Sequence, residues 1–207
     1  EKMSLTATAG SVEQYIGYAY QLLGDFTHDA QYQEKALEAH GKAVKSARTD
    51  YLSTPTPQRR RDYADRLTDY GWQLHVCHRS ESIATLTESL AEMKAVSDSN
   101  PGSEELQLDV ANSYARLGAV EVETGRIDSG LSHLRSARER ISLPVPVRAS
   151  DRELAVLFAR VQESLAAGLK QQGLVAEATV ALEQAIAAVE SEHIVPAWRV
   201  AELRKEK

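Results

Sequence analysis

Apolar residues recur at helical spacing along most of the chain, three and four positions apart, with polar residues between them. Glycine, proline and short polar runs separate these periodic segments. We therefore predict an all-α chain of paired helices. The predicted helices cover about 11–24, 30–51, 57–78, 80–96, 103–124, 126–141, 150–172 and 175–191.

Residues 114–137 carry small and large side chains at the offsets of one helix folded back on another. Small residues let two helix backbones approach where a large side chain would hold them apart. The positions are Leu117, Gly118, Gly125, Gly130, Leu134 and Ala137, and the same offsets are met by Leu165, Ala166, Gly173, Ala178, Leu182 and Ala185. The chain therefore contains at least two copies of one helical hairpin.

Two earlier segments fit the same offsets after insertions. The small residues are Gly17, Ala36 and Ala43 in the first copy, with seven extra residues, and Gly71, Ala84 and Ala91 in the second, with one extra. The fit weakens at His40 and Glu88, where a large apolar residue is expected. In every copy the two small residues of the second helix lie seven positions apart, about two helical turns. We predict that this pair faces the first helix of its own hairpin.

This pattern resembles the tetratricopeptide repeat (TPR), whose signature is W-x2-L-G-x2-Y followed by A-x3-F and a late proline. Tyr114-x2-Leu117-Gly118, Gly130-x3-Leu134 and Pro144 correspond to it. The residue equivalent to Gly118 stands at 17, 71, 118 and 166, so the period is longer than the usual value of about 34. Such long repeats resemble the C-terminal TPR arrays of bacterial serine/threonine protein kinases.

The resemblance implies a right-handed α-superhelix of about four TPR-like repeats with a C-terminal capping helix. We expect residues 1–10 to be a frayed segment and residues 11–207 to form a single domain. The repeats are predicted at about 11–52, 57–98, 103–142 and 150–191, and the cap at 196–207. The implied function is a non-catalytic protein-interaction module, as in the regulatory or scaffolding region of a larger bacterial signalling protein such as a kinase.

The predicted helix ends rest on local signals. Gly24, Gly125 and Gly173 are expected to end first helices in the left-handed conformation, and His78 occupies the equivalent place in the second copy. Helix starts are expected at the capping pairs Ser11 with Gln14, Thr56 with Pro57, Ser103 with its following glutamates, and Ser150 with Glu153.

Charge and composition exclude several functions. A net charge of −6 argues against nucleic acid as a partner, because phosphate binding needs a basic surface. No apolar run approaches about 18 residues and no signal-peptide pattern opens the chain, so we expect no membrane contact and a cytoplasmic location. A protein or peptide is the expected partner, and self-association into a homo-oligomer is the alternative.

Catalytic and cofactor motifs are missing from the sequence. The chain has no GxGxxG loop, no VAIK-like strand and no HRD or DFG motif, and Gly24-Asp25-Phe26 is interpreted as a helix end. His75, Cys77 and His78 suggest zinc at first sight, but Cys77 points away from the two histidines on a helix and no fourth ligand has suitable spacing. We expect no metal, no cofactor and an unreactive cysteine; an enzyme of unrecognised type is the remaining alternative.

The expected binding surface follows from the position of Gly118. If Gly118 faces its partner helix, the residue after it and those at helical spacing from there face the hollow of the superhelix. The predicted partner-binding residues are Gln14, Tyr18, Gln21, Asp65, Thr68, Trp72, His75, Asn112, Arg116, Arg160, Glu163 and Lys170, with Ala115, Ala119, Val122 and Ala167 on the same face.

Trp72 is the predicted anchor, because tryptophan is enriched in binding hot spots; packing against the neighbouring first helix is the alternative. The carboxylate clamp of chaperone-binding TPR proteins uses lysines, asparagines and an arginine. Only Arg116 matches that set, and Gln14, Tyr18, Asp69 and Asn112 stand at the other clamp positions. The mixed charges instead predict a partner segment of both signs with one apolar anchor.

Overall fold

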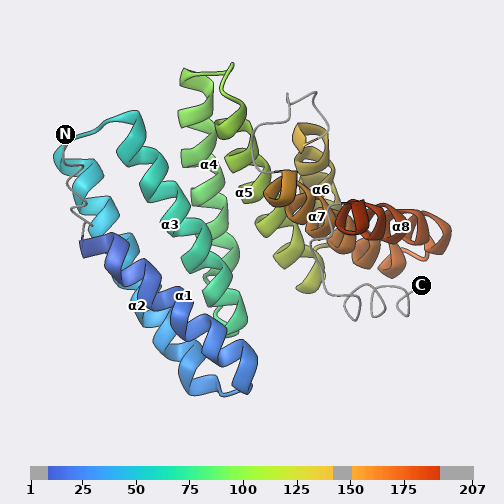
Figure 1. Cartoon of the computed structure of the whole chain (residues 1–207), viewed down its shortest axis with the longest axis horizontal. Helices are drawn as coiled ribbons and strands as arrows, with labels where there is room; N and C mark the ends of the chain where they lie inside the picture. Colours follow the sequence, from blue (N-terminus) through green and yellow to red (C-terminus); the bar gives the residue numbers. More distant parts are fainter. Residues whose placement is uncertain (1–8, 142–150, 192–207) are drawn as a thin grey trace. The chain divides into compact units, whose positions relative to one another are not determined.

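The computed structural model describes residues 9–141 and 151–191, and the part described is entirely α-helical. The helices are α1 (Ala9–Thr27), α2 (Ala30–Ser53), α3 (Pro57–Val76), α4 (Ser82–Ser99), α5 (Glu104–Glu123), α6 (Ile127–Ile141), α7 (Asp151–Gln171) and α8 (Val175–Ser191). Consecutive helices form pairs, α1 with α2 through α7 with α8 (Figure 1). The all-α class and the sequential helix pairs are confirmed.

The chain divides into two compact units, Glu1–Ser99 and Asn100–Lys207. In the first unit α2 packs against both α1 and α3, and α3 packs against α4. In the second unit α7 packs against α5, α6 and α8, and α5 packs against α6. The single domain over residues 11–207 stays a prediction. Pro144 and the predicted cap at 196–207 lie outside the described residues.

Side-chain caps start three of the helices. Thr56 accepts a hydrogen bond from the Arg59 amide, with Pro57 in the first turn, and Ser103 accepts one from the Leu106 amide, as predicted. Asp29 caps α2 through the Gln31 amide. The predicted Ser11 cap is wrong, because α1 already begins at Ala9. Ser150 lies outside the described residues.

A residue in the left-handed backbone conformation lies in the turn after each of the four first helices. His78 has φ 55°, Gly125 has φ 84° and Gly173 has φ 79°, so these three predictions are confirmed. The prediction for Gly24 is wrong, because α1 continues to Thr27 and His28 takes the left-handed conformation with φ 55°. The seven extra residues of the first copy therefore lengthen its helices, and only His28 and Asp29 separate α1 from α2.

Gly24 instead serves close packing. A Cβ atom there would lie 2.5 Å from the Gln33 side chain on α2. A side chain at this position would therefore require the flexible Gln33 side chain to move.

The small residues of the third and fourth copies lie between paired helices as predicted. A Cβ atom on Gly118 would lie 2.8 Å from the Gly130 carbonyl oxygen and 2.8 Å from Leu134. Ala137, Ala178 and Ala185 are all buried. The first copy follows the same rule, because Ala36 and Ala43 are buried and the His40 ring lies against Gly17.

The second copy has a different register from the one predicted. Ala84 and Ala91 are exposed, whereas Ser82 and Ser89 are buried, again seven residues apart. Leu86, not Glu88, lies against Gly71, where an added Cβ would be 2.7 Å from its Cγ. The spacing from Gly71 to Ser82, the small residue that faces α3, is thus eleven residues, one fewer than the twelve from Gly118 to Gly130 and not one more. Two buried serines take the place of the expected small apolar residues.

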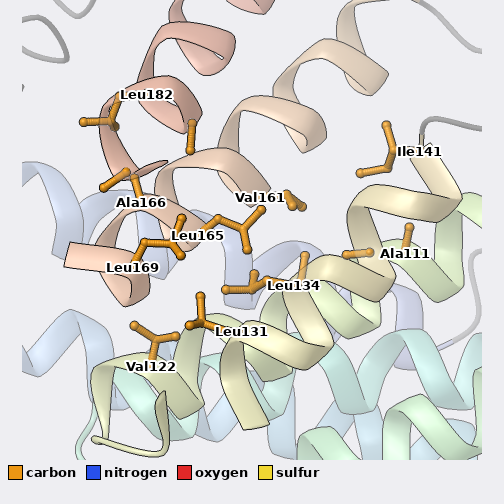
Figure 2. Packing of buried hydrophobic residues seen from close by; sticks show 14 residues of the cluster. Ala111, Val122, Leu131, Leu134, Ile141, Val161, Leu165, Ala166, Leu169 and Leu182 are labelled. Carbon is orange, nitrogen blue, oxygen red and sulfur yellow. The ribbon is translucent and has the colours of Figure 1, made fainter. Parts of the chain in front are cut away.

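The core of the second unit is continuous through its four helices. Figure 2 shows Val122 of α5, Leu131 and Leu134 of α6, Val161, Leu165 and Leu169 of α7 and Leu182 of α8 converging. This packing of helix on helix holds α5 and α7 in place and fixes which of their residues are left accessible.

Candidate functional site

The predicted partner-binding residues lie on the first helix of each hairpin. Gln14, Tyr18 and Gln21 are on α1, Asp65, Thr68, Trp72 and His75 on α3, Asn112 and Arg116 on α5, and Arg160, Glu163 and Lys170 on α7. The structure places these residues in two separate groups, α1 and α3 in the first unit and α5 and α7 in the second.

In the first unit a polar cluster joins α1 to α3. The Gln14 amide donates to Asp69 at 2.8 Å, to Asp65 at 3.4 Å and to the Tyr18 hydroxyl at 2.9 Å. The Tyr18 hydroxyl donates to the same Asp69 oxygen at 2.5 Å. Three of the predicted residues therefore meet, and Asp69 completes the set. We call Gln14, Tyr18, Asp65 and Asp69 the α1–α3 polar cluster.

Two carboxylates share this cluster, and their repulsion changes the acidity of its members. Burial and the charge of Asp69 raise the pKa of Asp65, while Arg66, 2.9 Å away, opposes the change. Burial and Asp69 also raise the pKa of Tyr18, so its hydroxyl stays a proton donor. The cluster thus brings two carboxylates together, and Asp65 is also ion-paired with Arg66.

His40 of α2 lies beneath this cluster. Its side chain is 1% exposed and its Nε2 atom has no hydrogen-bond partner within the described residues. The Tyr18 ring meets it edge-on, with centroids 5.4 Å apart. Burial and the charge of Arg66 lower the pKa of His40 to about 4, so the ring is neutral at pH 7. Only the poor fit of His40 to an apolar position could have revealed it in the sequence.

The other predicted residues of α3 are less accessible than expected. Thr68 is buried and shares a hydrogen bond with Ser89 of α4, so the prediction that it faces a partner is wrong. Trp72 is half-buried, and its ring lies 5.7 Å from that of His75. Thr68 faces α4 because it lies three residues before Gly71, on the same side of α3.

In the second unit the predicted face of α5 is largely covered. Ala115 and Val122 are buried in the core with α7, and Ala119 is only 8% exposed. These three residues were expected to be open, and that expectation is wrong; Ala115 and Val122 are covered because they belong to the core shared by α5, α6, α7 and α8. Asn112 and Arg116 remain half-buried.

The predicted residues of α7 line a cavity. Glu163, Ala167 and Lys170 face Val175, Thr179 and other residues of α8 around a space of about 260 Å³. Arg160, one turn before Glu163, is half-buried, and burial lowers the pKa of its guanidinium while Glu163 opposes the change. This cavity combines both charge signs with an apolar wall, but it lies between α7 and α8 of one hairpin and not between first helices, where the binding face was predicted.

A second cavity in this unit was not predicted. It measures about 370 Å³, and Arg135 and Arg138 of α6 and Glu177 of α8 surround an apolar floor that includes Leu165 and Leu169. The signal in the sequence is the spacing of Arg135 and Arg138, three positions apart on one helix face. The predicted binding face included residues of first helices alone, whereas Arg135 and Arg138 lie on α6, a second helix.

The described residues contain no group of three or more His, Cys, Asp or Glu side chains placed to hold a metal ion. Burial raises the pKa of the Cys77 thiol, which lies 3.5 Å from the Gln33 carbonyl oxygen. None of the described helices is long and apolar enough to cross a membrane.

Comparisons with known proteins leave the family open. No family model matches the chain, and no curated protein matches it. Among solved structures, one titled "Crystal structure of MamA protein" aligns with 90% of this chain and 98% of its own, at 16% identity and a TM-score of 0.40. At that TM-score the likeness adds no evidence on function.

Proposed function

We propose that the chain is a non-catalytic protein-interaction module that holds a peptide or partner helix against its first helices, α1 and α3 in one unit and α5 and α7 in the other. The observation that carries the proposal is the α1–α3 polar cluster. Gln14, which is buried, and Tyr18 of one hairpin meet Asp65 and Asp69 of the next, so equivalent helices of two repeats contribute to one polar cluster.

The chemistry of the cluster favours a basic side chain on the partner. Asp65 and Asp69 repel each other, and a lysine or arginine placed between them would form charge-assisted hydrogen bonds with both. Asp65 is accessible enough for this, with half of its side chain exposed (49%). An Arg would fit better than a Lys, because its planar fork can bind two carboxylates at once.

The cavity between α7 and α8 favours a different part of a partner. Glu163 and Lys170 supply one charge of each sign, and Ala167 and Val175 supply apolar surface. A short apolar side chain flanked by charged residues would fit this composition. Trp72 in the first unit stays the proposed aromatic anchor.

We also propose that this module belongs to a larger bacterial signalling protein, such as a serine/threonine kinase, in the cytoplasm. The support is the long repeat period and the sequence of the repeat starts alone. A kinase domain encoded in the same gene would support this setting, and its absence there would contradict it.

The test of partner binding compares two changes on α3. Purified wild type, the double variant Asp65→Asn with Asp69→Asn, and the control Asp62→Asn are used to capture proteins from the native host. Asp62 is on the same helix but is exposed and bonds only locally, to Gln58. We expect the double variant to lose a partner that the wild type and the control retain.

The captured partner is then measured directly with a synthetic peptide of its basic segment. A loss of roughly tenfold or more in affinity for the double variant, with helicity unchanged by circular dichroism, supports the proposed site. Retention of every partner by a folded double variant and by Trp72→Ala contradicts it.

A further inference from the structure

Helix α1 is amphipathic in the unusual sense that its large apolar residues face outward. Against the rest of the unit it buries only Gly10, Gln14, Gly17 and Gly24. The exposed apolar residues are Val12 (47%), Tyr15 (69%), Ile16 (39%), Leu22 (69%), Leu23 (43%) and Phe26 (87%), with exposed Ala19 among them. We call these seven residues the α1 stripe.

The α1 stripe has the spacing of a helix–helix contact. Its members lie at intervals of three, one, three, three, one and three residues, so they follow one side of the helix over its whole length. Single exposed apolar residues are ordinary on protein surfaces, but a continuous stripe of this kind marks an interaction site. Among the described helices of its unit, α1 packs extensively against α2 alone, along which it lies in Figure 1.

The stripe is symmetric about Ala19. Residues at equal distances on either side of it are both apolar, so Ile16 corresponds to Leu22, Tyr15 to Leu23 and Val12 to Phe26. A two-fold symmetric interface needs a surface that is complementary to itself, with each residue meeting its counterpart. When two copies of α1 run antiparallel with Ala19 on the two-fold axis, each of these pairs comes into contact. The smallest residue lies at the crossing point, where the helices approach most closely.

The charges beside the stripe are compatible with the same arrangement. Glu13 and Asp25 are the charged residues within α1, and they lie on opposite flanks of the stripe. In the antiparallel pair Glu13 of one copy is nearest Thr27 of the other, and Asp25 is nearest Ser11. Each carboxylate therefore faces a hydroxyl-bearing residue and not another carboxylate, so like charges do not oppose pairing.

We propose that the α1 stripe is a homodimer interface in which two copies of the chain pair their α1 helices antiparallel about Ala19. The partner is a second copy because one two-fold rotation brings each apolar residue of the α1 stripe against another apolar residue and each carboxylate against a hydroxyl group. The interface spans one helix of about 28 Å, which is small for a permanent complex. The dimer is therefore expected to be weak and to form reversibly with increasing protein concentration.

The first test uses two exposed leucines of nearly equal accessibility. Leu22 of the stripe is 69% exposed and Leu52 of α2, outside it, is 68% exposed. Sedimentation equilibrium over a concentration series should show a dimer for the wild type and for Leu52→Lys. Leu22→Lys should weaken dimerisation by roughly tenfold or more, because it places a charge within the apolar contact. Since Leu22 is exposed, this variant should keep the thermal stability of the monomer.

The second test determines how the two α1 helices are aligned, by oxidative cross-linking of cysteine variants made in a Cys77→Ser background. Ala19→Cys should cross-link to itself, because the two residues meet on the axis. Val12→Cys should not, because two such residues would be separated along the helix by about 21 Å, but it should cross-link to Phe26→Cys when the two proteins are mixed. In each case two thiols lose two protons and two electrons to the added oxidant.

Three results would overturn the proposal. A wild type that stays monomeric at the highest soluble concentration shows that another part of the chain or another protein covers the stripe. A dimer that Leu22→Lys leaves unchanged places the interface elsewhere. Self-cross-linking of Val12→Cys shows a parallel pair. The partner-capture test of Asp65 and Asp69 is separate from all three, so either proposal can fail alone.

Discussion

The hydroxyl groups of Thr68 and Ser89 lie 2.6 Å apart between α3 and α4, and both lie within hydrogen-bond distance of the Ala64 carbonyl oxygen, so one donates to that oxygen and the other donates to the first. Ser89 is fully buried, so its side chain occupies the place that Ala137 and Ala185 occupy in later copies. This pair shows that a small polar residue can replace a small apolar one when its hydroxyl has partners.

The register of α4 can be tested with two arginine substitutions on that helix. Ser89→Arg should destabilise the protein by about 3 kcal/mol or more, because it buries an unpaired charge where there is no space. Ala91→Arg should change stability by less than about 0.5 kcal/mol, because Ala91 is exposed. Urea unfolding followed by circular dichroism measures both. Equal losses would contradict the register.

Close approach of α5 and α6 depends on Gly118. The variant Gly118→Ala should lose about 1 to 2 kcal/mol, although alanine favours helix by about 1 kcal/mol, because its Cβ would meet the backbone of α6. That atom would lie 2.8 Å from the Gly130 carbonyl oxygen, which cannot move without shifting the helix.

Gly102→Ala is the matched control, since an added Cβ there meets nothing within 4 Å. It should leave the unfolding midpoint almost unchanged. Ala119→Arg, which the sequence alone predicts to be harmless, should now destabilise the protein as well, because Ala119 is 8% exposed. A stable Gly118→Ala protein would show that the helices do not pack this closely.

His40 should make stability depend on pH. Its folded pKa of about 4 lies below the usual value of about 6.5, so the unfolded chain takes up the proton first as the pH falls. The contribution of His40 to the free energy of unfolding is therefore fully present above about pH 6.5. It decreases by about 2 to 3 kcal/mol as the pH falls from there to about 4.

The comparison is with His40→Leu, because Leu86, Leu134 and Leu182 hold the equivalent positions. Its unfolding free energy should fall less between pH 7 and pH 4.5 than that of the wild type. Asp65 has a raised pKa and acts in the opposite direction, but it is present in both proteins and cancels in the difference. Parallel pH profiles of the two proteins would exclude a buried neutral His40.

Cys77 should react slowly in the folded protein. Burial raises the pKa of its thiol, so little thiolate is present at pH 7, and the side chain is half-buried against Gln33. Labelling with an excess of a chromogenic disulfide reagent should be much faster in urea than in buffer. Fast labelling of the native protein, or one equivalent of zinc retained after dialysis, would contradict an inert, metal-free cysteine.

Much of the fold could be predicted from local sequence. The helices follow from apolar spacing, Thr56 and Ser103 cap as their neighbours require, and His78 takes the left-handed turn predicted for it. These features depend on a few adjacent residues, so they can be read without knowing what packs against them. Gln14, Tyr18 and Asp65 could be placed on one side of their helices for the same reason.

Other features depended on tertiary packing. Gly24 lies inside α1, packed against the Gln33 side chain of α2, and α4 turns Ser82 and Ser89, not Ala84 and Ala91, toward α3. Ala119 became buried for a similar reason, since a neighbouring surface covers it.

Local sequence was enough to predict which segments are helices, where several of them begin and end, and that small residues lie between the two helices of a pair. Which side of each helix is covered depends on tertiary packing. Helical periodicity marks an apolar side without naming its partner, and the α1 stripe has the same pattern as a core-facing helix. The distance between two helices, fixed by every side chain between them, decides whether that side is buried within the chain or left for another molecule.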